Sequence, residues 1–185
     1  MSYYFLVASL PSFTLDDPPG LSEDAFMDRC RDQLSPRDWA AMQAVMAPAP
    51  RADPHPFAEA WYRVETALRN ALVRVRAERR KADAAAYLRE NAAYGAEASR
   101  AVADAFGRKT PLERERALDR FRWEQAEQLA GFDPFATRAV LAYGVRLKLA
   151  RRWVTIEREK GEEQAEALIK QKPRTASGRT AENQT

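Results

Sequence analysis

The longest segment with helical patterning runs from Asp133 to Lys170 and reads DPFATRAVLAYGVRLKLARRWVTIEREKGEEQAEALIK. Asp133 is a suitable N-cap, and Pro134 follows at the first helical position, where a missing N–H costs nothing. We predict a helix that would be about 57 Å long at roughly 1.5 Å per residue. A compact chain of this size has a radius of gyration of about 16 Å, so one end should project. Gly161 is the position where the helix could end, because glycine is a poor helix former.

Apolar side chains cover more than half of the circumference of this helix when residues are placed at 100° intervals. They are Phe135, Ala139, Ala142, Tyr143, Val145, Leu147, Leu149, Trp153, Val154 and Ile156. The remaining polar strip consists of Thr137, Gly144, Lys148, Arg151, Arg152 and Thr155. So wide an apolar arc predicts that the helix is buried on several sides.

Two charged residues, Arg146 and Glu157, fall inside the apolar arc, and Trp153 is close by on the same face. Buried charge is costly unless it is paired. One interpretation is an intramolecular pair, or an arginine whose stem lies on the core while its head reaches water. The other is a contact with another protein, in which arginine and tryptophan are typical anchors. Arg146, Trp153 and Glu157 are therefore our candidate partner interface.

Length and composition predict a folded chain of one domain or two small ones, because 45% of the 185 residues are hydrophobic. The net charge of +3 is uneven: residues 1–60 carry nine acids and four arginines, so this part is −5 and the remainder +8. We expect the acidic part to lie against the basic part, within the molecule or in a neighbour. The single cysteine, Cys30, excludes an internal disulfide and favours a reducing, cytoplasmic setting.

We expect an all-α fold, a bundle of about six helices with a long C-terminal helix. Residues 1–47 should form a short apolar segment and a hairpin of two helices capped by Ser22 and Ser35. The apolar segment, residues 3–10, should be buried, and its pattern does not decide between helix and strand. Residues 48–56 form a proline-rich linker. Residues 57–171 form the main bundle, and residues 172–185 a disordered tail.

Three helices are predicted in the main bundle before the long one. The first runs from Phe57 to about Arg80, with the i,i+4 pairs Glu59–Arg63 and Glu65–Arg69. The second is the alanine-rich segment from Asp83 to Ala105, which Gly107 ends. The third begins at Thr110, where TPLE is a capping box with proline at N1, and runs to Ala130; its inward residues are Leu118, Phe121, Ala126 and Leu129.

No constellation in the sequence points to catalysis. The chain has no glycine-rich phosphate loop and no set of residues that would hold a metal. Cys30 is most simply a small apolar core residue, and the lone His55, flanked by prolines, a solvated loop residue. We expect a protein that is not an enzyme and binds no cofactor. No segment approaches the roughly 20 apolar residues that span a bilayer, and the short apolar N-terminus does not fit a signal peptide. We therefore expect the protein to contact a membrane only through a partner or at the surface.

A basic helical module that binds nucleic acid is the alternative class. Seven cations follow Tyr62, namely Arg63, Arg69, Arg74, Arg76, Arg79, Arg80 and Lys81. They fall on both flanks of the apolar stripe with two acids among them, which favours a solvated, salt-bridged face over phosphate binding. If nucleic acid were bound, Arg74 to Lys81 and the cationic strip of the long helix would bind it.

The N-terminal sequence MSYYFLVASLP, followed by a short acidic loop with prolines and LSEDAF, with Cys30 beyond, resembles the opening of an uncharacterised bacterial family. Members of that family are typically encoded among the subunits of V/A-type ATPases. The match extends more loosely through the Trp61 helix and the FDPF turn at 132–135. More distantly, the chain is similar to the all-helical central-stalk protein of those rotary ATPases, which couples the rotor axle to the membrane ring, although it is much shorter than the usual three helical repeats.

The resemblance implies a non-catalytic subunit or assembly factor of a V/A-type ATPase, cytoplasmic and peripheral to the inner face of the membrane through its complex. Its partners would be protein subunits bound through helices, and no catalytic residues carry over.

Overall fold

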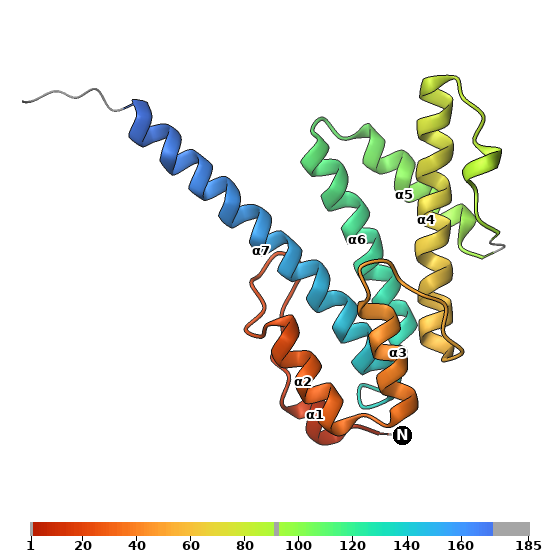
Figure 1. Ribbon diagram of the computed structural model, residues 1–185, viewed down its shortest axis with the longest axis vertical. Coiled ribbons are helices and arrows are strands. Elements are labelled where there is room, and N and C mark those ends of the chain that lie inside the picture. Colours follow the sequence, from red (N-terminus) through yellow and green to blue (C-terminus); the bar gives the residue numbers. More distant parts are fainter. Residues whose placement is uncertain (1, 91–92, 172–185) are drawn as a thin grey trace, which may run out of the picture.

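The computed structural model describes residues 2–90 and 93–171, with side chains to residue 159. The predicted all-α class is confirmed: the described residues form seven α-helices and one 3₁₀ turn (Figure 1). The helices are α1 (Tyr4–Ala8), α2 (Glu23–Gln33), α3 (Pro36–Met46), α4 (Pro56–Arg80), α5 (Gly95–Gly107), α6 (Pro111–Ala130) and α7 (Thr137–Gln171), and the 3₁₀ turn η1 is Ala85–Tyr87.

Three helix starts lie where the capping residues predict them. The side chains of Ser22 and Ser35 accept hydrogen bonds from backbone N–H groups in the first turns of α2 and α3. Thr110 and Glu113 form a complete capping box at the start of α6, since each side chain accepts from the other's backbone N–H. A side-chain oxygen at the N-cap satisfies amide groups that have no partner within the helix.

The long helix begins at Thr137, three residues after Pro134, the predicted first helical position. Asp133 does not cap it: its side chain accepts from the N–H of Phe135, 2.9 Å away, in a turn. Residues 135 and 136 pair instead with the N-terminus, where Tyr3 N–H donates to Phe135 C=O at 2.7 Å beside an isolated bridge between Ser2 and Ala136. Gly161 does not end the helix, which continues to Gln171.

The prediction of a helix from Asp83 to Ala105 is wrong over its first half. Residues 88–90 are not helical, and α5 begins only at Gly95. The reason is tertiary, because the Asn70 side chain holds the backbone of Arg89 in both directions, accepting from its N–H at 3.0 Å and donating to its C=O at 2.7 Å. Arg69 donates to the C=O of Tyr87 at 2.9 Å. Alanine-rich propensity is a weak preference that such contacts override.

The N-terminal segment, whose conformation the sequence leaves open, is the short helix α1. Tyr3 and Leu6 are buried, as expected, but Tyr4 and Phe5 are 58% and 89% exposed. The prediction that the whole segment is buried is therefore wrong for these two aromatic residues.

Helix α7 is the axis on which the other elements pack. It contacts α2, α3, α4 and α6, while α5 packs on α4 and α6. One hydrophobic cluster contains residues from both sides of the proline-rich linker, from Leu6 and Phe26 to Leu68 and Trp153. The N-terminal helices and the main bundle thus share one core. In Figure 1 the last turns of α7 extend past this core, and no other helix of the described chain accompanies them.

The predicted disordered tail, 172–185, lies outside the described residues. None of the described helices combines the length and the apolar character needed to cross a bilayer.

Candidate functional site

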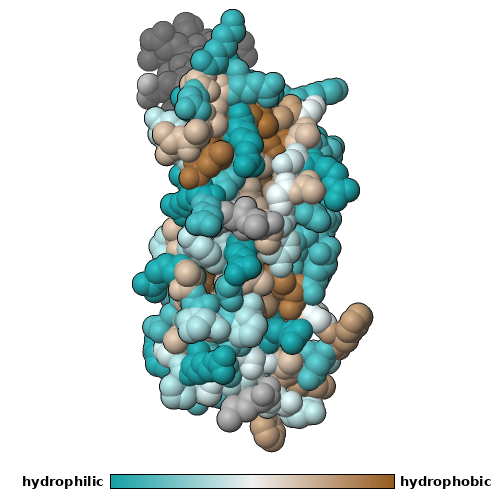
Figure 2. All heavy atoms as spheres, turned by 90° about the vertical axis from the view of Figure 1, so that its right-hand side faces the viewer, coloured by the Kyte–Doolittle hydropathy of each residue, from teal (hydrophilic) through white to brown (hydrophobic). Residues whose placement is uncertain are grey.

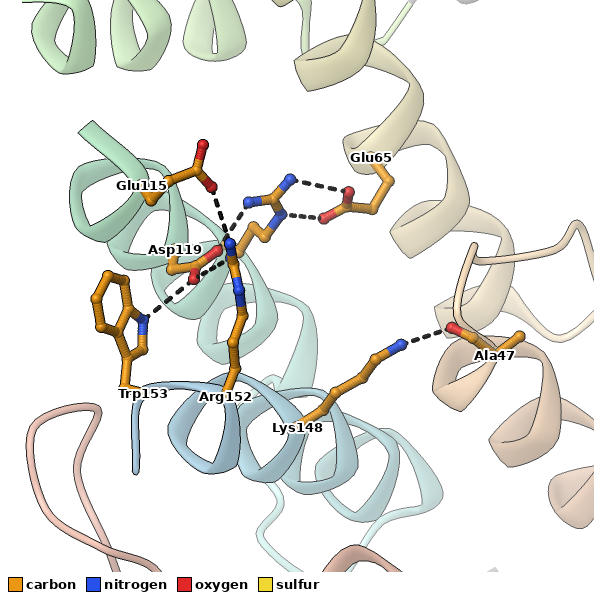
Figure 3. Close-up of polar contacts among 8 residues, drawn as sticks. Ala47, Glu65, Glu115, Asp119, Lys148, Arg152 and Trp153 are labelled. Atoms are coloured by element: carbon orange, nitrogen blue, oxygen red, sulfur yellow. Dashed lines mark hydrogen bonds and ion pairs between the residues drawn. The ribbon is translucent and has the colours of Figure 1, made fainter. Parts of the chain in front are cut away.

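A buried carboxylate, Asp119 of α6, accepts three hydrogen bonds, two of them from residues of α7 (Figure 3). It is fully buried and accepts from Arg152 Nη1 at 2.7 Å, Arg122 Nη1 at 2.8 Å and Trp153 Nε1 at 3.1 Å. A buried charge persists only if it is paired and its lone pairs are used. Both oxygens of Asp119 accept hydrogen bonds, so the group holds α6 and α7 together.

The network extends outward from Asp119 to α4 and to solvent. Arg122 pairs with Glu65 of α4, at 2.7 Å between Nε and Oε1, and Arg152 pairs with Glu115 at 3.0 Å. Arg122 and Glu65 are each 19% exposed, whereas Arg152 and Glu115 are each 44% exposed. Glu65 therefore does not form its predicted pair with Arg69, while the pair Glu59–Arg63 is confirmed.

Burial and charge act in opposite directions on the pKa values of this network. Burial raises the pKa of Asp119, and the neighbouring Arg122 and Arg152 only partly offset it. For Arg122, burial would lower the pKa, but Glu65 and Asp119 outweigh it and the net change is upward. Arg122 is therefore a permanent cation at the centre of the contact between α4 and α6.

A cavity of about 790 Å³ lies beside the network, between α7, α4, α6 and the residues around the starts of α2 and the linker. Four members of the predicted polar strip of α7 line it, namely Lys148, Arg151, Arg152 and Thr155. Of these four, Arg152 and Thr155 remain exposed to solvent. The other two members of the strip face α3 and α2, since Thr137 donates to Asp38 at 3.3 Å and Gly144 is buried against Met42 and Phe26.

Lys148, which lines this cavity, donates hydrogen bonds to the carbonyl groups at the C-terminal end of α3 (Figure 3). Its Nζ donates to the C=O of Ala47 at 2.5 Å and of Met46 at 3.2 Å. The last carbonyls of a helix lack partners within it and favour a cation. Burial lowers the pKa of Lys148.

The three residues of the candidate partner interface lie in contacts within the chain. Trp153 is 2% exposed, and its indole N–H donates a hydrogen bond to Asp119. Glu157 pairs with Arg116 of α6, 3.3 Å away, and Arg116 also pairs with Asp16 and lies over the Trp153 ring. Arg146 pairs with Glu127 at 3.1 Å and lies over Trp123, while its Nε is buried without a hydrogen-bond partner. Of the three, Arg146 alone has a buried polar atom without a hydrogen-bond partner.

The expected approach of the acidic part of the chain to the basic part occurs at Asp16, which pairs with Arg116 and with Arg120. Sequence reasoning did not find Asp119, because one acid among the polar residues of α6 looks like a surface residue. The signal that could have found it is its spacing: it follows the inward Leu118 and has Arg122 three residues later, on the same side.

The prediction for Cys30 is confirmed, and the prediction for His55 is wrong. Cys30 is buried in the core, and burial raises its pKa to about 12, so the thiolate is not populated near neutral pH. His55 is not a solvated loop residue: its side chain is 12% exposed. Its Nδ1 accepts from Phe57 N–H at 3.2 Å, capping α4, and its Nε2 lies 3.7 Å from Asp38.

The basic residues at the end of α4 do not form the salt-bridged face that their spacing favours. Arg74, Arg76, Arg80 and Lys81 are exposed, and none of them makes an ion pair with a described residue. Arg79 lies over the ring of Phe106, 4.5 Å from its centroid. Figure 2, which faces this side of the molecule, shows mainly hydrophilic side chains over much of it. Across the described parts of the chain, no group of three or more His, Cys, Asp or Glu could hold a metal ion.

Comparison with known families places a match in the C-terminal half of the chain. Residues 96–174 match the family model described as Protein of unknown function (DUF2764). The matched region takes in almost all of α5 together with α6 and α7, and so includes Asp119, Arg122, Arg152 and Trp153. It does not include the first thirty residues. No curated protein and no solved structure matches the chain.

Proposed function

We propose that the protein is a non-catalytic subunit or assembly factor of a V/A-type ATPase and acts through contacts between helices. The observation that carries the proposal is α7 itself. At 35 residues it is about 52 Å long at roughly 1.5 Å per residue, and its first half is fixed in the core while its last turns extend beyond it (Figure 1). A helix held rigidly at one end presents its other end to a partner with little ordering cost.

Two further points support the proposal. The N-terminal sequence resembles a family encoded with rotary ATPase subunits, and the charged groups of the Asp119 network join α4, α6 and α7. On this proposal the protein is cytoplasmic, and its partners are protein subunits at the inner face of the membrane.

Affinity purification of the tagged full chain from its native cell, followed by mass spectrometry, tests the proposal. We expect subunits of the rotary ATPase to be enriched over a tag-only control. A variant that ends after Glu159 keeps every side chain of the described core and should lose that enrichment while keeping its melting temperature. If no ATPase subunit co-purifies with the full chain, the proposal is wrong.

Binding to nucleic acid is a second candidate, supported by the exposed cations of α4 that make no ion pair with described residues. Such binding would weaken steeply with salt, because neutralised phosphates release counterions. Fluorescence anisotropy with a single-stranded RNA and a duplex DNA, between 50 and 200 mM salt at micromolar protein, tests it. Arg76→Glu with Arg80→Glu should abolish the binding. Salt-independent or absent binding by the unmodified chain would exclude this candidate.

A further inference from the structure

His55, the one histidine of the chain, lies where the proline-rich linker joins α4. In Figure 1 the linker runs back along α3, so that the start of α4 lies close to α3. The N–H of His55 donates to Asp53 Oδ1 at 2.8 Å, and the C=O of His55 accepts from Glu59 N–H at 3.0 Å. These two bonds hold the backbone at His55, so its imidazole ring is kept at the entry to α4.

The hydrogen bond at Nδ1 fixes the protonation state of the ring. Phe57 N–H donates to His55 Nδ1 at 3.2 Å, so this nitrogen carries no proton and the neutral ring has its proton at Nε2. Phe57 is the second residue of α4, where a backbone N–H has no partner within the helix. A ring protonated at both nitrogens has no acceptor left, and its charge lies at the positive end of the helix dipole. Protonation of His55 therefore removes the cap of α4.

Asp38 of α3 is the second partner of the ring. His55 Nε2 lies 3.7 Å from Asp38 Oδ1, which is longer than a hydrogen bond. Tyr3 and Thr137 donate to the other oxygen of Asp38, Oδ2. A charged imidazole and a carboxylate form a hydrogen bond of about 2.7–2.9 Å, so a shift of the protonated ring by about 1 Å would complete it. Repulsion from Phe57 N–H and attraction to Asp38 thus both favour the change of partner.

The charged groups that act on His55 come from α3, the linker and α7. Burial, the largest influence, lowers the pKa of His55; Asp38 and Asp53 raise it, Arg37 and Arg138 lower it, and the net change is downward from the ordinary value of 6.5. The neutral ring therefore stabilises the fold above pH 6.5, and this stabilisation is lost as the pH falls from 6.5 to the folded-state pKa.

Protons from solvent reach the ring. The side chain of His55 is 12% exposed, and it lines a hollow of about 350 Å³ together with Leu129 of α6 and Thr137 and Arg138 of α7. The ring can therefore titrate without unfolding of the chain.

We propose that His55 is a pH-dependent switch that changes its partner from α4 to α3. In the neutral form its ring caps α4 through Phe57 N–H. In the protonated form the ring pairs with Asp38, and the first turn of α4 loses its cap and opens. The switch does not depend on the proposed function, because every group in it belongs to this chain.

Nitrogen NMR of the full chain labelled at histidine reads the ring directly, because a single histidine gives a single set of signals. At pH 7.5 we expect the neutral ring with its proton at Nε2. We expect the second proton to bind as the pH is lowered to 5.0, with a midpoint below 6.5. A proton at Nδ1 at pH 7.5, or a ring that is still neutral at pH 5.0, would overturn the proposal.

Solvent exchange of the Phe57 amide, measured by NMR at pH 7.5 and 5.0 and corrected for the intrinsic effect of pH, tests the cap. Protection at pH 5.0 should be lower by about fivefold or more, as for the loss of a helix cap. The amide of Ala25 is the internal control, because its acceptor is the Ser22 hydroxyl, which does not titrate in this range. Its protection should be the same at both pH values.

His55→Asn supplies a cap that does not titrate, since asparagine is among the most favourable N-cap residues. In this variant the protection of the Phe57 amide should be equal at the two pH values. If the variant loses protection at pH 5.0 as the unmodified chain does, the proposal is wrong. It is also wrong if the Phe57 amide of the unmodified chain keeps its protection while the ring is protonated, and that measurement decides the matter even if the variant does not fold.

Discussion

The indole N–H of Trp153 donates to the buried carboxylate of Asp119 across the interface of α7 and α6, at 3.1 Å. The same oxygen accepts from Arg152, and the other oxygen from Arg122, which reaches α4 through Glu65. One acidic side chain therefore fixes the relative positions of three helices. The helix that extends beyond the core is anchored at this point.

Replacing Asp119 by alanine should destabilise the protein by about 3–5 kcal/mol, because the largely buried Arg122 loses its pair with Asp119 and Trp153 Nε1 its acceptor. Glu115→Gln is the control: it removes another partner of Arg152, but both groups are 44% exposed, so the loss should be below about 1 kcal/mol. Urea unfolding followed by circular dichroism measures both. Equal stability losses in the two variants would show that Asp119 has no special role.

Gly144→Ala should destabilise the protein by about 1–3 kcal/mol, because a methyl group there overpacks the core. Its Cβ would lie 3.0 Å from Phe26 Cε1 and from Met42 Sδ, and the ring of Phe26 is fully buried. Gly107→Ala is the matched control in α5, where nothing lies within 4 Å of the added Cβ. We expect that variant to be neutral or stabilised by up to about 1 kcal/mol. Melting temperatures that fall equally in both variants would contradict the close packing at Gly144.

The acid sensitivity of the fold should depend on Asp38. Burial would raise its pKa, but hydrogen bonds from Tyr3, Ser35 and Thr137 outweigh burial, and the net change is downward. The pKa of Asp38 is lower in the folded state than its ordinary value of 3.8. The Asp38 carboxylate therefore stabilises the fold at pH values above 3.8, and this stabilisation is lost as the pH falls through the folded-state pKa.

Melting temperatures between pH 7 and pH 2.5 test this dependence. Asp38→Asn should be less stable than the unmodified chain at pH 7, and the difference should shrink toward pH 2.5. Asp28→Asn removes an exposed carboxylate that pairs with Arg31 and serves as the control for the loss of one negative charge. A difference that stays constant with pH for Asp38→Asn would refute the assignment.

Asn70→Ala should release residues 87–90 from the side of α4 while leaving the helices in place. Asn70 is 4% exposed, and its side chain makes both hydrogen bonds to the Arg89 backbone. Hydrogen exchange followed by mass spectrometry should show loss of protection at the amide of Arg89, which the local contact alone protects. Asn70→Asp keeps the acceptor for that N–H and should retain more protection. Unchanged exchange in the alanine variant would mean that other contacts hold the segment.

Local chemistry in the sequence determined the class of the fold and most helix boundaries. The capping side chains of Ser22, Ser35 and Thr110 act on amides within three residues, so their effect is readable without any tertiary contact. The apolar arc of α7 likewise predicted burial of Tyr143, Leu147 and Trp153, which is confirmed. Periodicity depends only on the spacing of residues along one helix.

The tertiary structure alone decided which polar residues meet. Asp119 and Trp153 are 34 residues apart, and Asn70 and Arg89 are 19 apart, distances at which spacing carries no information about contact. The start of α7 at Thr137, after the bond between Tyr3 and Phe135, and the non-helical residues 88–90, beside Asn70, both go with such pairings. They depend on how the helices pack against one another. An unpaired polar group is costly in the low dielectric of the core, so each buried polar group pairs with whichever partner the packing places beside it.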